Sequence, residues 1–174
     1  GNYFSNNNYK SLTQSHKDFF DFRSIRFPGL ISVNTAPTGG TSDYLPEMLH
    51  SAAQKKDYTC FVKADSQLPF MVMPDAIQSI IRLMSVEKNH LSQSIYNISS
   101  FNPTVNDFFN KLKNYYDNFN ISYNVNHSRQ EMVDGWPSSI DTSRALYDWD
   151  WSPKYDIEKA FSEYFIPYLE KKYQ

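Results

Sequence analysis

Glycine is scarce in this sequence, and its scarcity excludes a class of sites. The five glycines are Gly1, Gly29, Gly39, Gly40 and Gly135. Loops that hold nucleotide phosphates need glycines at fixed spacings, because the backbone must approach the ligand closely. The glycines of this chain match neither the dinucleotide loop nor the P-loop. The chain therefore carries no such phosphate-binding loop of its own.

Cysteine is scarcer still, because Cys60 is the only one. No disulfide can form within the chain, and a reducing, intracellular compartment, cytoplasmic or mitochondrial, is expected. Cys60 lies in the apolar run "YTCFV", which favours a buried structural thiol over a nucleophile. The four histidines are scattered without ligand spacing, so we expect no metal site.

Charge excess and long apolar runs are also missing. The net charge is −2 and the isoelectric point is about 6.1, which gives no electrostatic reason to expect nucleic acid or an anionic membrane as a partner. No apolar run approaches the roughly 20 residues that span a bilayer. Aromatic residues make up 17% of the chain, enough for a packed core. Since Gly1 is not Met, we expect the chain to start inside a longer protein or after a processing or cloning cut.

Apolar spacing predicts helices and strands that alternate without an internal repeat or linker, which indicates an α/β or α+β class. Strands are expected over residues 22–27, 58–62, 70–73, 94–98 and 119–125. Helices are expected over residues 11–20 and 43–56, from Pro74 onward, after Thr104 and from about Ile157.

Three of these helices carry particular signals. Ile77, Ile80, Ile81 and Met84 follow the i, i+3, i+4, i+7 spacing of one apolar helix face. Thr104 with Asp107 three residues on is typical of a helix cap, with Val105, Phe108, Phe109, Leu112 and Tyr116 as the buried stripe. Phe161, Tyr164, Phe165 and Tyr168 share one face of the last helix, and Pro167 is expected to kink or shorten it.

Two polar segments are candidates for function. The loop within "RFPGLISVNTAPTGGTSDY", residues 26–44, leaves the carboxyl end of a strand, where α/β proteins bind ligands. Thr41 and Ser42 offer hydroxyls near a helix start there, although a plain surface crossover fits its composition too. In "DGWPSSIDTSRA", Trp136 either fills space in the hydrophobic core (a core plug) or forms an aromatic wall of a ligand site. Composition alone favours the plug. Trp149 and Trp151 are interpreted as packing residues.

The segments "RSIRFPGLIS", "GGTSDY", "YTCF", "LPFMVMPDAI", "YNIS", "DGWPSSIDTSRA" and "DWDWSPKYDIEKAF" together resemble the C-terminal half of the short-chain-type, NAD-dependent L-threonine 3-dehydrogenases. These belong to the extended short-chain dehydrogenases, with the nucleotide-sugar epimerases. The resemblance runs in order from about Arg23 to about Phe161. It implies a single unit over residues 1–174. Residues 1–20 match poorly, and residues 21–174 comprise the last strands of a Rossmann-type NAD(P)-binding sheet plus a small α/β substrate-binding lobe.

The resemblance also implies roles for individual residues. Phe27, Pro28, Gly29 and Leu30 correspond to the stretch that borders the nicotinamide end of NAD. Thr41 and Ser42 correspond to substrate-facing hydroxyls, with Ser42 replacing the family's Thr. Trp136 corresponds to an aromatic that closes over the amino-acid substrate, which reverses the preference for a plug. Asp75 corresponds to a family-wide acid that we interpret as structural. The chain departs from the family at Gln67, Val72 and Gln78.

The family's catalytic parts are expected to lie outside this chain. Its glycine-rich loop is absent here, and neither Tyr3 nor Tyr9 is followed by Lys four residues on, so we expect the chain to lack the Tyr-x-x-x-Lys pair that performs the chemistry. The spacing from Arg23 places the catalytic tyrosine just before Gly1. No catalytic residue is therefore assigned within the chain.

The leading hypothesis is the substrate-binding part of an NAD-dependent L-threonine 3-dehydrogenase that is inactive as this chain alone. Its expected partners are L-threonine or a similar small molecule. A nucleotide-sugar epimerase or dehydratase, which needs a longer groove, and a non-catalytic remnant are the alternatives. A half-sheet would leave a bare strand edge and an apolar face, so a homodimer is another expected outcome.

Overall fold

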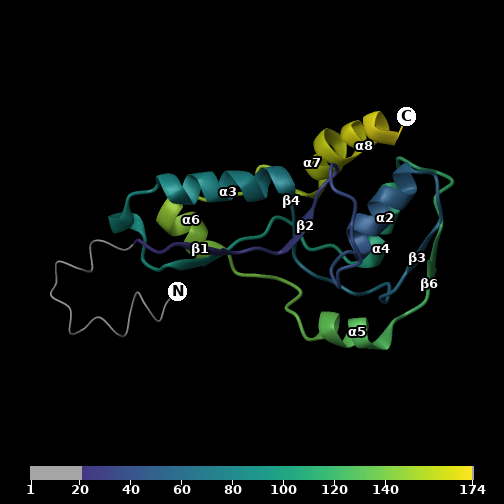
Figure 1. Ribbon diagram of the computed structural model, residues 1–174, viewed down its shortest axis with the longest axis horizontal. Coiled ribbons are helices and arrows are strands. Elements are labelled where there is room, and N and C mark those ends of the chain that lie inside the picture. The colour runs from purple at the N-terminus through teal and green to yellow at the C-terminus, as the bar shows by residue number, and fades with distance from the viewer. Residues whose placement is uncertain (1–20, 174) are drawn as a thin grey trace.

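The computed structural model describes residues 21–173. The helix expected over residues 11–20 and the poorly matching lead segment 1–20 lie outside this range. In Figure 1 the described elements form an elongated body, with one pair of strands at one end, another in the middle and a third at the far end. The chain passes between these three regions along extended segments.

The strands pair in parallel as three two-stranded sheets. Strand β1 (Ser24–Arg26) pairs with β5 (Ile95–Asn97), and β2 (Gly29–Ile31) pairs with β4 (Phe70–Val72). Strand β3 (Tyr58–Cys60) pairs with β6 (Ile121–Tyr123). Parallel neighbours need long crossover connections, which here contain helices, so the expected α/β class is confirmed.

Three helices lie within these crossovers. They are α2 (Tyr44–Ala53), α3 (Met73–Ser85) and α4 (Val105–Lys113). The capping box of α4 is confirmed, because the Thr104 hydroxyl accepts from the Asp107 N–H at 3.0 Å and the Asp107 carboxylate accepts from the Thr104 N–H at 3.1 Å. All five expected strands exist, each only three residues long.

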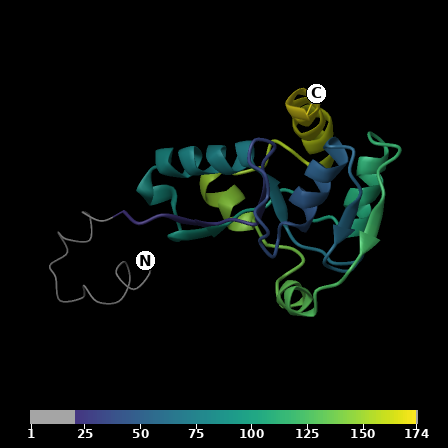
Figure 2. The ribbon, with the colours of Figure 1, turned by 45° about the vertical axis from the view of Figure 1, so that its right-hand side comes forward.

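Several elements were not expected from the sequence. Strand β2 begins at Gly29, directly after Pro28, and depends on pairing with residues about forty positions away, which local patterns do not reveal. The further helical segments are η2 (Lys88–His90), α5 (His127–Asp134) and α6 (Ser143–Trp149). Figure 2 shows α5 end-on, set off from the rest of the body.

The last helix runs through Pro167 without ending. It comprises α7 (Ile157–Lys159), a π-helical stretch η3 (Ala160–Phe165) and α8 (Ile166–Tyr173). Pro167 has no N–H to donate to the preceding turn, and the wider π turns lie immediately before it. The stripe is confirmed for Phe161, Tyr164 and Phe165, whereas Tyr168 is 53% exposed.

Two hydrophobic clusters form the core. The larger surrounds α2, α4 and the terminal helix, and it includes Cys60, whose pKa burial raises to about 11. The smaller lies between α3, β5 and α6 and contains Trp149 and Trp151, stacked with ring centroids 5.5 Å apart. The interpretations of Cys60 as a structural thiol and of both tryptophans as packing residues are confirmed.

Helix α3 turns its strongest apolar face outward. Its buried side carries Asp75, Ala76, Ser79 and Leu83. The stripe that the sequence pattern identified is instead 44–73% exposed, and it comprises Ile77, Ile80, Ile81 and Met84. The helix itself is confirmed, but a face of this kind normally packs against a core.

Candidate functional site

The candidate loop, residues 32–43, leaves the carboxyl end of β2 and leads into α2. Its base is held by the terminal helix: Lys172 Nζ donates to the carbonyl oxygens of Val33 and Asn34, each at 2.9 Å. The Val33 N–H points at the Tyr164 hydroxyl at 3.5 Å. The start of the loop is therefore fixed by residues more than 130 positions away in the chain.

His50 of α2 also holds the start of the loop in place. Its Nε2 lies 3.0 Å from the Ser32 carbonyl oxygen, which can only accept, so Nε2 carries the proton. Its Nδ1 then accepts from the Tyr173 hydroxyl at 2.8 Å. Burial lowers the pKa of His50, and the ring stays neutral and joins the loop, α2 and α8.

The tip of the loop is organised by Asp43. One carboxylate oxygen of Asp43 accepts from the backbone N–H groups of Thr38, Gly39 and Gly40 at 3.1, 3.1 and 2.8 Å. Gly39 has φ +91°, a backbone conformation that favours glycine. The two glycines of "GGTSDY" therefore serve a tight turn that wraps one carboxylate.

Helix α5 contacts this tip from the other side. Arg129 Nη2 donates to the Gly39 carbonyl oxygen at 2.9 Å, and its guanidinium lies 4.4 Å from the centroid of the Phe61 ring. The Thr41 hydroxyl lies 3.7 Å from the Met132 sulfur. Thr41, and Ser42 beside it in the chain, are half-buried. Arg129 and Asp43 were not predicted as part of the site, because no local pattern distinguishes them from surface charges.

Trp136 lies just beyond α5, one turn after Met132. The backbone N–H of Trp136 donates to the Val133 carbonyl oxygen at 3.1 Å, so the helical turn continues as far as Trp136. The side chain is 47% exposed. Interpreting Trp136 as a core plug is therefore wrong. Because Thr41 contacts Met132, the structure brings the hydroxyl loop and the helix end that carries Trp136 to the same part of the molecule.

Residues Phe27 to Leu30 lie where the chain passes from the first sheet to the second. Phe27 is 37% exposed, and Pro28 follows it before β2 begins. Gly29 packs so tightly on Phe70 that an added Cβ would lie 2.5 Å from a ring carbon. This close approach is a packing reason for glycine that is independent of any ligand.

Asp75 at the start of α3 ties three segments together. Its carboxylate accepts from the N–H groups of Lys154 and Tyr155, each at 3.1 Å, and the Ser100 hydroxyl lies 3.5 Å away. Burial raises its pKa, while these hydrogen bonds act in the opposite direction. The structural interpretation of Asp75 is confirmed.

The prediction that the chain lacks the Tyr-x-x-x-Lys spacing is wrong as stated. Tyr155 and Lys159 have this spacing, and so do Tyr168 and Lys172. Lys172 is engaged by loop carbonyls, and Tyr155 accepts from the adjacent Lys154 at 3.2 Å. A catalytic tyrosine needs a lowered pKa, whereas every described tyrosine with a shifted pKa has it raised by burial, including Tyr96 to about 12.

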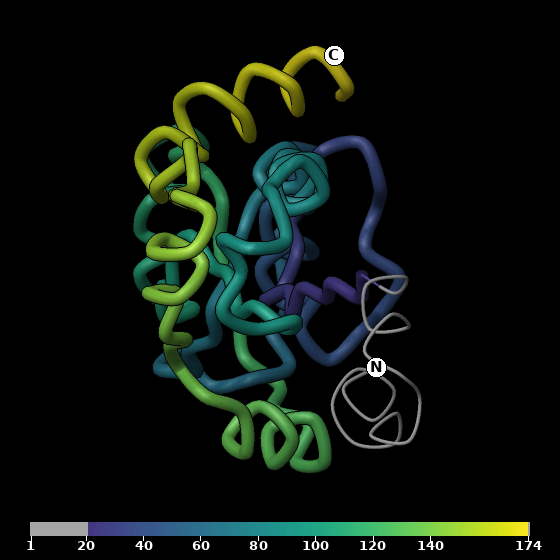
Figure 3. Tube along the Cα trace, turned by 90° about the vertical axis from the view of Figure 1, so that its left-hand side faces the viewer, coloured from purple at the N-terminus to yellow at the C-terminus, as the bar shows by residue number. Residues whose placement is uncertain are grey.

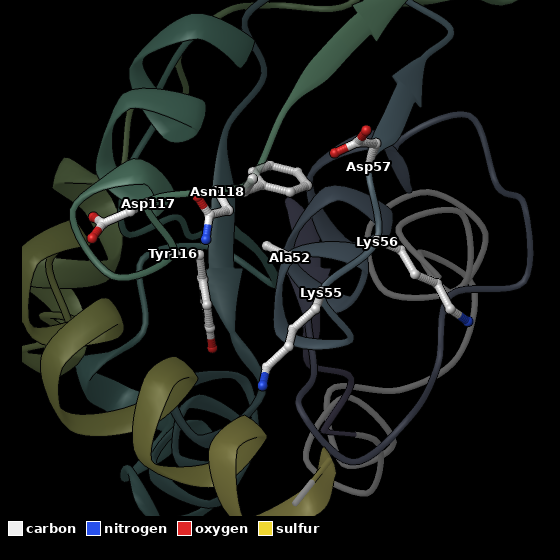
Figure 4. Close-up of a pocket in the computed structure, with 8 residues that line it drawn as sticks. Ala52, Lys55, Lys56, Asp57, Tyr116, Asp117 and Asn118 are labelled. Carbon is white, nitrogen blue, oxygen red and sulfur yellow. The ribbon is translucent and has the colours of Figure 1, made fainter.

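A cavity of about 200 Å³ lies at the opposite end of α2 from the loop. Figure 4 shows Lys55 and Tyr116 extending along it toward the same side. The Tyr116 hydroxyl is buried without a hydrogen-bond partner among the described residues. The cavity contains none of the residues predicted to bind cofactor or substrate, because α2 separates it from the loop by about 15 Å of helix. No described group of His, Cys, Asp and Glu is placed to hold a metal ion.

Comparison with known proteins gives relatives in both sequence and structure. An uncharacterised epimerase/dehydratase of Staphylococcus haemolyticus is 37% identical over 88% of this chain and 48% of its own length. The mitochondrial L-threonine 3-dehydrogenase of Bos taurus is 34% identical over 79% of this chain and 37% of its own length. No protein-family model matches the chain.

Solved structures extend this result. A monomeric L-threonine 3-dehydrogenase from a metagenome superposes with a TM-score of 0.85 at 37% identity, covering 93% of this chain and 52% of that one. The chain is thus similar to the C-terminal part of L-threonine 3-dehydrogenases and of epimerase/dehydratase-like proteins. A UDP-glucose 4-epimerase of Thermotoga maritima, with a TM-score of 0.69 and 18% identity, shares the fold.

The chain spans about half the length of the curated relatives it matches, and it corresponds to their C-terminal part. Its parallel strands match part of the Rossmann-type fold of these structures. No helix among residues 21–173 is long and apolar enough to cross a membrane.

Proposed function

We propose that this chain is the substrate-binding part of an NAD-dependent L-threonine 3-dehydrogenase, which oxidises L-threonine to 2-amino-3-oxobutyrate. The observation that supports the proposal best is the contact of the hydroxyl loop with α5, through Thr41 on Met132 and Gly39 on Arg129. It sets Thr41, with Ser42 next in the chain, against the helix that Trp136 closely follows. Relatives named L-threonine 3-dehydrogenase in sequence and structure support the same substrate.

Each residue has a definite task in this proposal. The hydroxyls of Thr41 and Ser42 hydrogen-bond the polar groups of the amino acid, and the indole of Trp136 covers it and excludes water. Asp43 and Arg129 hold the loop in place from behind. This precision matters, because a displacement of about 1 Å at a substrate-positioning residue can lower a rate by roughly a hundredfold.

The cofactor site is only partly within this chain. Phe27 offers an exposed aromatic surface and Leu30 a partly exposed apolar one, which suit one side of a nicotinamide ring. When bound, NAD accepts the hydride from the substrate carbon. The chain has no glycine-rich loop for the pyrophosphate, so it contributes one wall of the cofactor site. We therefore infer that the chain alone forms no NADH from L-threonine.

Binding can be tested on the chain by itself. Isotope-labelled chain is titrated with L-threonine, and the amide and indole signals are followed by NMR. We expect saturable shifts concentrated at Thr41, Ser42 and Trp136, weaker shifts with D-threonine, and loss of the response in Trp136→Ala. Shifts scattered over the surface, or equal for both enantiomers, would contradict the proposal. Lys159→Ala, outside the loop, serves as the control variant.

An epimerase or dehydratase acting on a nucleotide sugar is the second candidate. It is supported by the Staphylococcus haemolyticus relative, which is described as an uncharacterised epimerase/dehydratase and is 37% identical to this chain. The same titration with UDP-glucose separates the two candidates. Saturable shifts with UDP-glucose and none with L-threonine would favour the epimerase. No response to either ligand would favour a remnant without binding function.

A further inference from the structure

The start of the candidate loop has its backbone served by side chains instead of by secondary structure. Three successive carbonyl oxygens, those of Ser32, Val33 and Asn34, accept hydrogen bonds from α2 and α8. His50 serves the first of them, and the Lys172 ammonium serves the other two. Backbone groups withdrawn from water must find partners of this kind when no strand or helix supplies them. The direction in which the chain leaves β2 therefore depends on these two side chains.

The Lys172 ammonium acts here as a donor to carbonyls and not as half of an ion pair. Within residues 21–173 no carboxylate lies within ion-pair distance of it. Its nitrogen lies 5.5 Å from the centroid of the Tyr173 ring, next to it on α8. Hydrogen bonds from a charged donor are about twice as strong as those between neutral groups. Loss of this one ammonium would release two loop carbonyls at once.

The loop is held at both ends, by different elements. Its start contacts α8, and its tip contacts α5 through Gly39 and Thr41. Figure 3 shows the loop beginning below the yellow terminal helix and descending along one side of the molecule toward the green α5. Only the short segment 35–38 separates Asn34 from Gly39. A change of direction at the start of the loop must therefore displace its tip, where Thr41 lies.

We propose that α8 positions the candidate loop for the amino-acid substrate, through Lys172 and through the pair of Tyr173 and His50. Thr41 and Ser42 then meet the substrate in one arrangement. Lys172, Tyr173 and His50 are positioning residues, because they act through the loop. A loop that is already ordered binds more tightly, since binding no longer has to order it. This assignment rests on the proposed function for the identity of the substrate.

His50 makes the positioning sensitive to protons. Among the described residues, the ring faces the Ser32 carbonyl of the loop and, on α8, the Tyr173 hydroxyl and the Lys172 ammonium, with no carboxylate. A second proton on the ring would reverse the hydrogen bond to Tyr173 and place a positive charge near Lys172. Burial lowers the pKa of His50, so the neutral ring that holds the loop prevails at neutral pH and is lost as the pH falls.

The test measures the melting temperature of the chain alone and its affinity for L-threonine, by the NMR titration described above. Lys172→Met keeps an unbranched stem without the charge, whereas Lys172→Arg keeps the charge and can donate to both carbonyls. Tyr173→Phe and His50→Gln alter the second contact. Lys111→Met is the matched control, because Lys111 also bonds a distant side chain, that of Glu158, but lies on α4 and does not bond the loop.

We expect Lys172→Met to weaken L-threonine binding at least about fivefold, and Tyr173→Phe at least about twofold, while Lys172→Arg retains most of the affinity. In the ligand-free chain, Lys172→Met and Tyr173→Phe should also move the amide signals of Thr41 and Ser42. Lys111→Met should leave both the affinity and these signals unchanged, whatever its effect on the melting temperature.

The affinity should also depend on pH in a way that a merely structural contact would not produce. Between about pH 7 and pH 5, L-threonine binding by the wild type should weaken at least about threefold, and this dependence should be lost in His50→Gln. If Lys172→Met does not fold, Tyr173→Phe and the pH dependence supply the same readouts.

Two results would overturn the proposal. One is a Lys172→Met variant that melts earlier but binds L-threonine as the wild type does, which would assign the contacts to stability alone. The other is that the ligand-free amide signals of Thr41 and Ser42 stay in place in both Lys172→Met and Tyr173→Phe. A wild-type chain that binds no L-threonine would refute the proposed substrate, and the ligand-free signals would still decide whether α8 positions the loop.

Discussion

Replacing Gly29 by alanine should destabilise the fold through a single collision. An added Cβ would lie 2.5 and 2.6 Å from two carbons of the Phe70 ring, whereas ordinary contacts begin at 3.4 Å. The overlap is 3.4 − 2.5 = 0.9 Å. The ring cannot move freely, because Phe70 is fully buried and its ring packs edge-on against Tyr44 with centroids 5.7 Å apart.

Overpacking of this size costs about 2–3 kcal/mol. We therefore expect Gly29→Ala to lower the free energy of unfolding by that amount in urea titrations monitored by circular dichroism. In a protein of this length the melting temperature should fall by about 4–12 °C. Gly135→Ala is the matched control, since its Cβ would meet its nearest atoms at 3.4 and 3.5 Å.

The double variant with Phe70→Leu isolates the cause. If the collision is with the ring, Gly29→Ala should cost at least about 1 kcal/mol less when residue 70 is leucine. A cost of Gly29→Ala below about 0.5 kcal/mol, or an equal cost in both backgrounds, would refute the reasoning. The glycine would then be required for some other reason, such as the close approach of a ligand.

Three further predictions concern stability. Lys55→Gly should raise the free energy of unfolding by about 1 kcal/mol relative to Lys55→Ala, because φ at this residue is +58° at the end of α2; equal stabilities would refute this. Burial lowers the pKa of His50 in the folded chain, so as the pH falls the unfolded chain protonates this histidine before the folded chain does. The free energy of unfolding should therefore fall as the pH drops below about 6.5 and through the lower pKa of the folded state. His50→Gln should flatten this dependence in urea titrations between about pH 7 and pH 5, and an unchanged slope would contradict it. Thr104→Ala removes the hydroxyl that accepts from Asp107 and should cost about 1 kcal/mol by the same assay, whereas Thr104→Ser should cost less; equal losses would argue against the cap.

Local patterns predicted the elements whose signals lie within a few residues. Thr104 and Asp107 marked the start of α4, and Pro74 marked the start of α3. The pattern of Ile77, Ile80, Ile81 and Met84 identified a helix but not the direction its face takes. That direction depends on what α3 packs against, and its inner side is defined by distant partners such as Tyr96 and Trp149.

The candidate site was predictable only in part, for a related physical reason. Thr41, Ser42 and Trp136 were named through the family resemblance, and the structure adds the contacts that hold their surroundings. Arg129 reaches Gly39 across 90 positions and His50 reaches Tyr173 across 123. Contacts at such separations leave no periodic signal in the sequence, so the supporting residues could not be identified before the fold was known.

The central claim, that this chain binds L-threonine for an NAD-dependent oxidation, is tested most directly with a fusion protein in which the N-terminal part of the monomeric metagenome L-threonine 3-dehydrogenase precedes all 174 residues of this chain. The measurement is the rate of NADH formation from L-threonine by this fusion. The account predicts turnover that Trp136→Ala reduces at least about tenfold in kcat/KM, a loss of about 1.4 kcal/mol in transition-state binding, with NAD affinity unchanged. A fusion that binds NAD yet forms no NADH from L-threonine, or one whose rate is indifferent to Trp136→Ala, would contradict it.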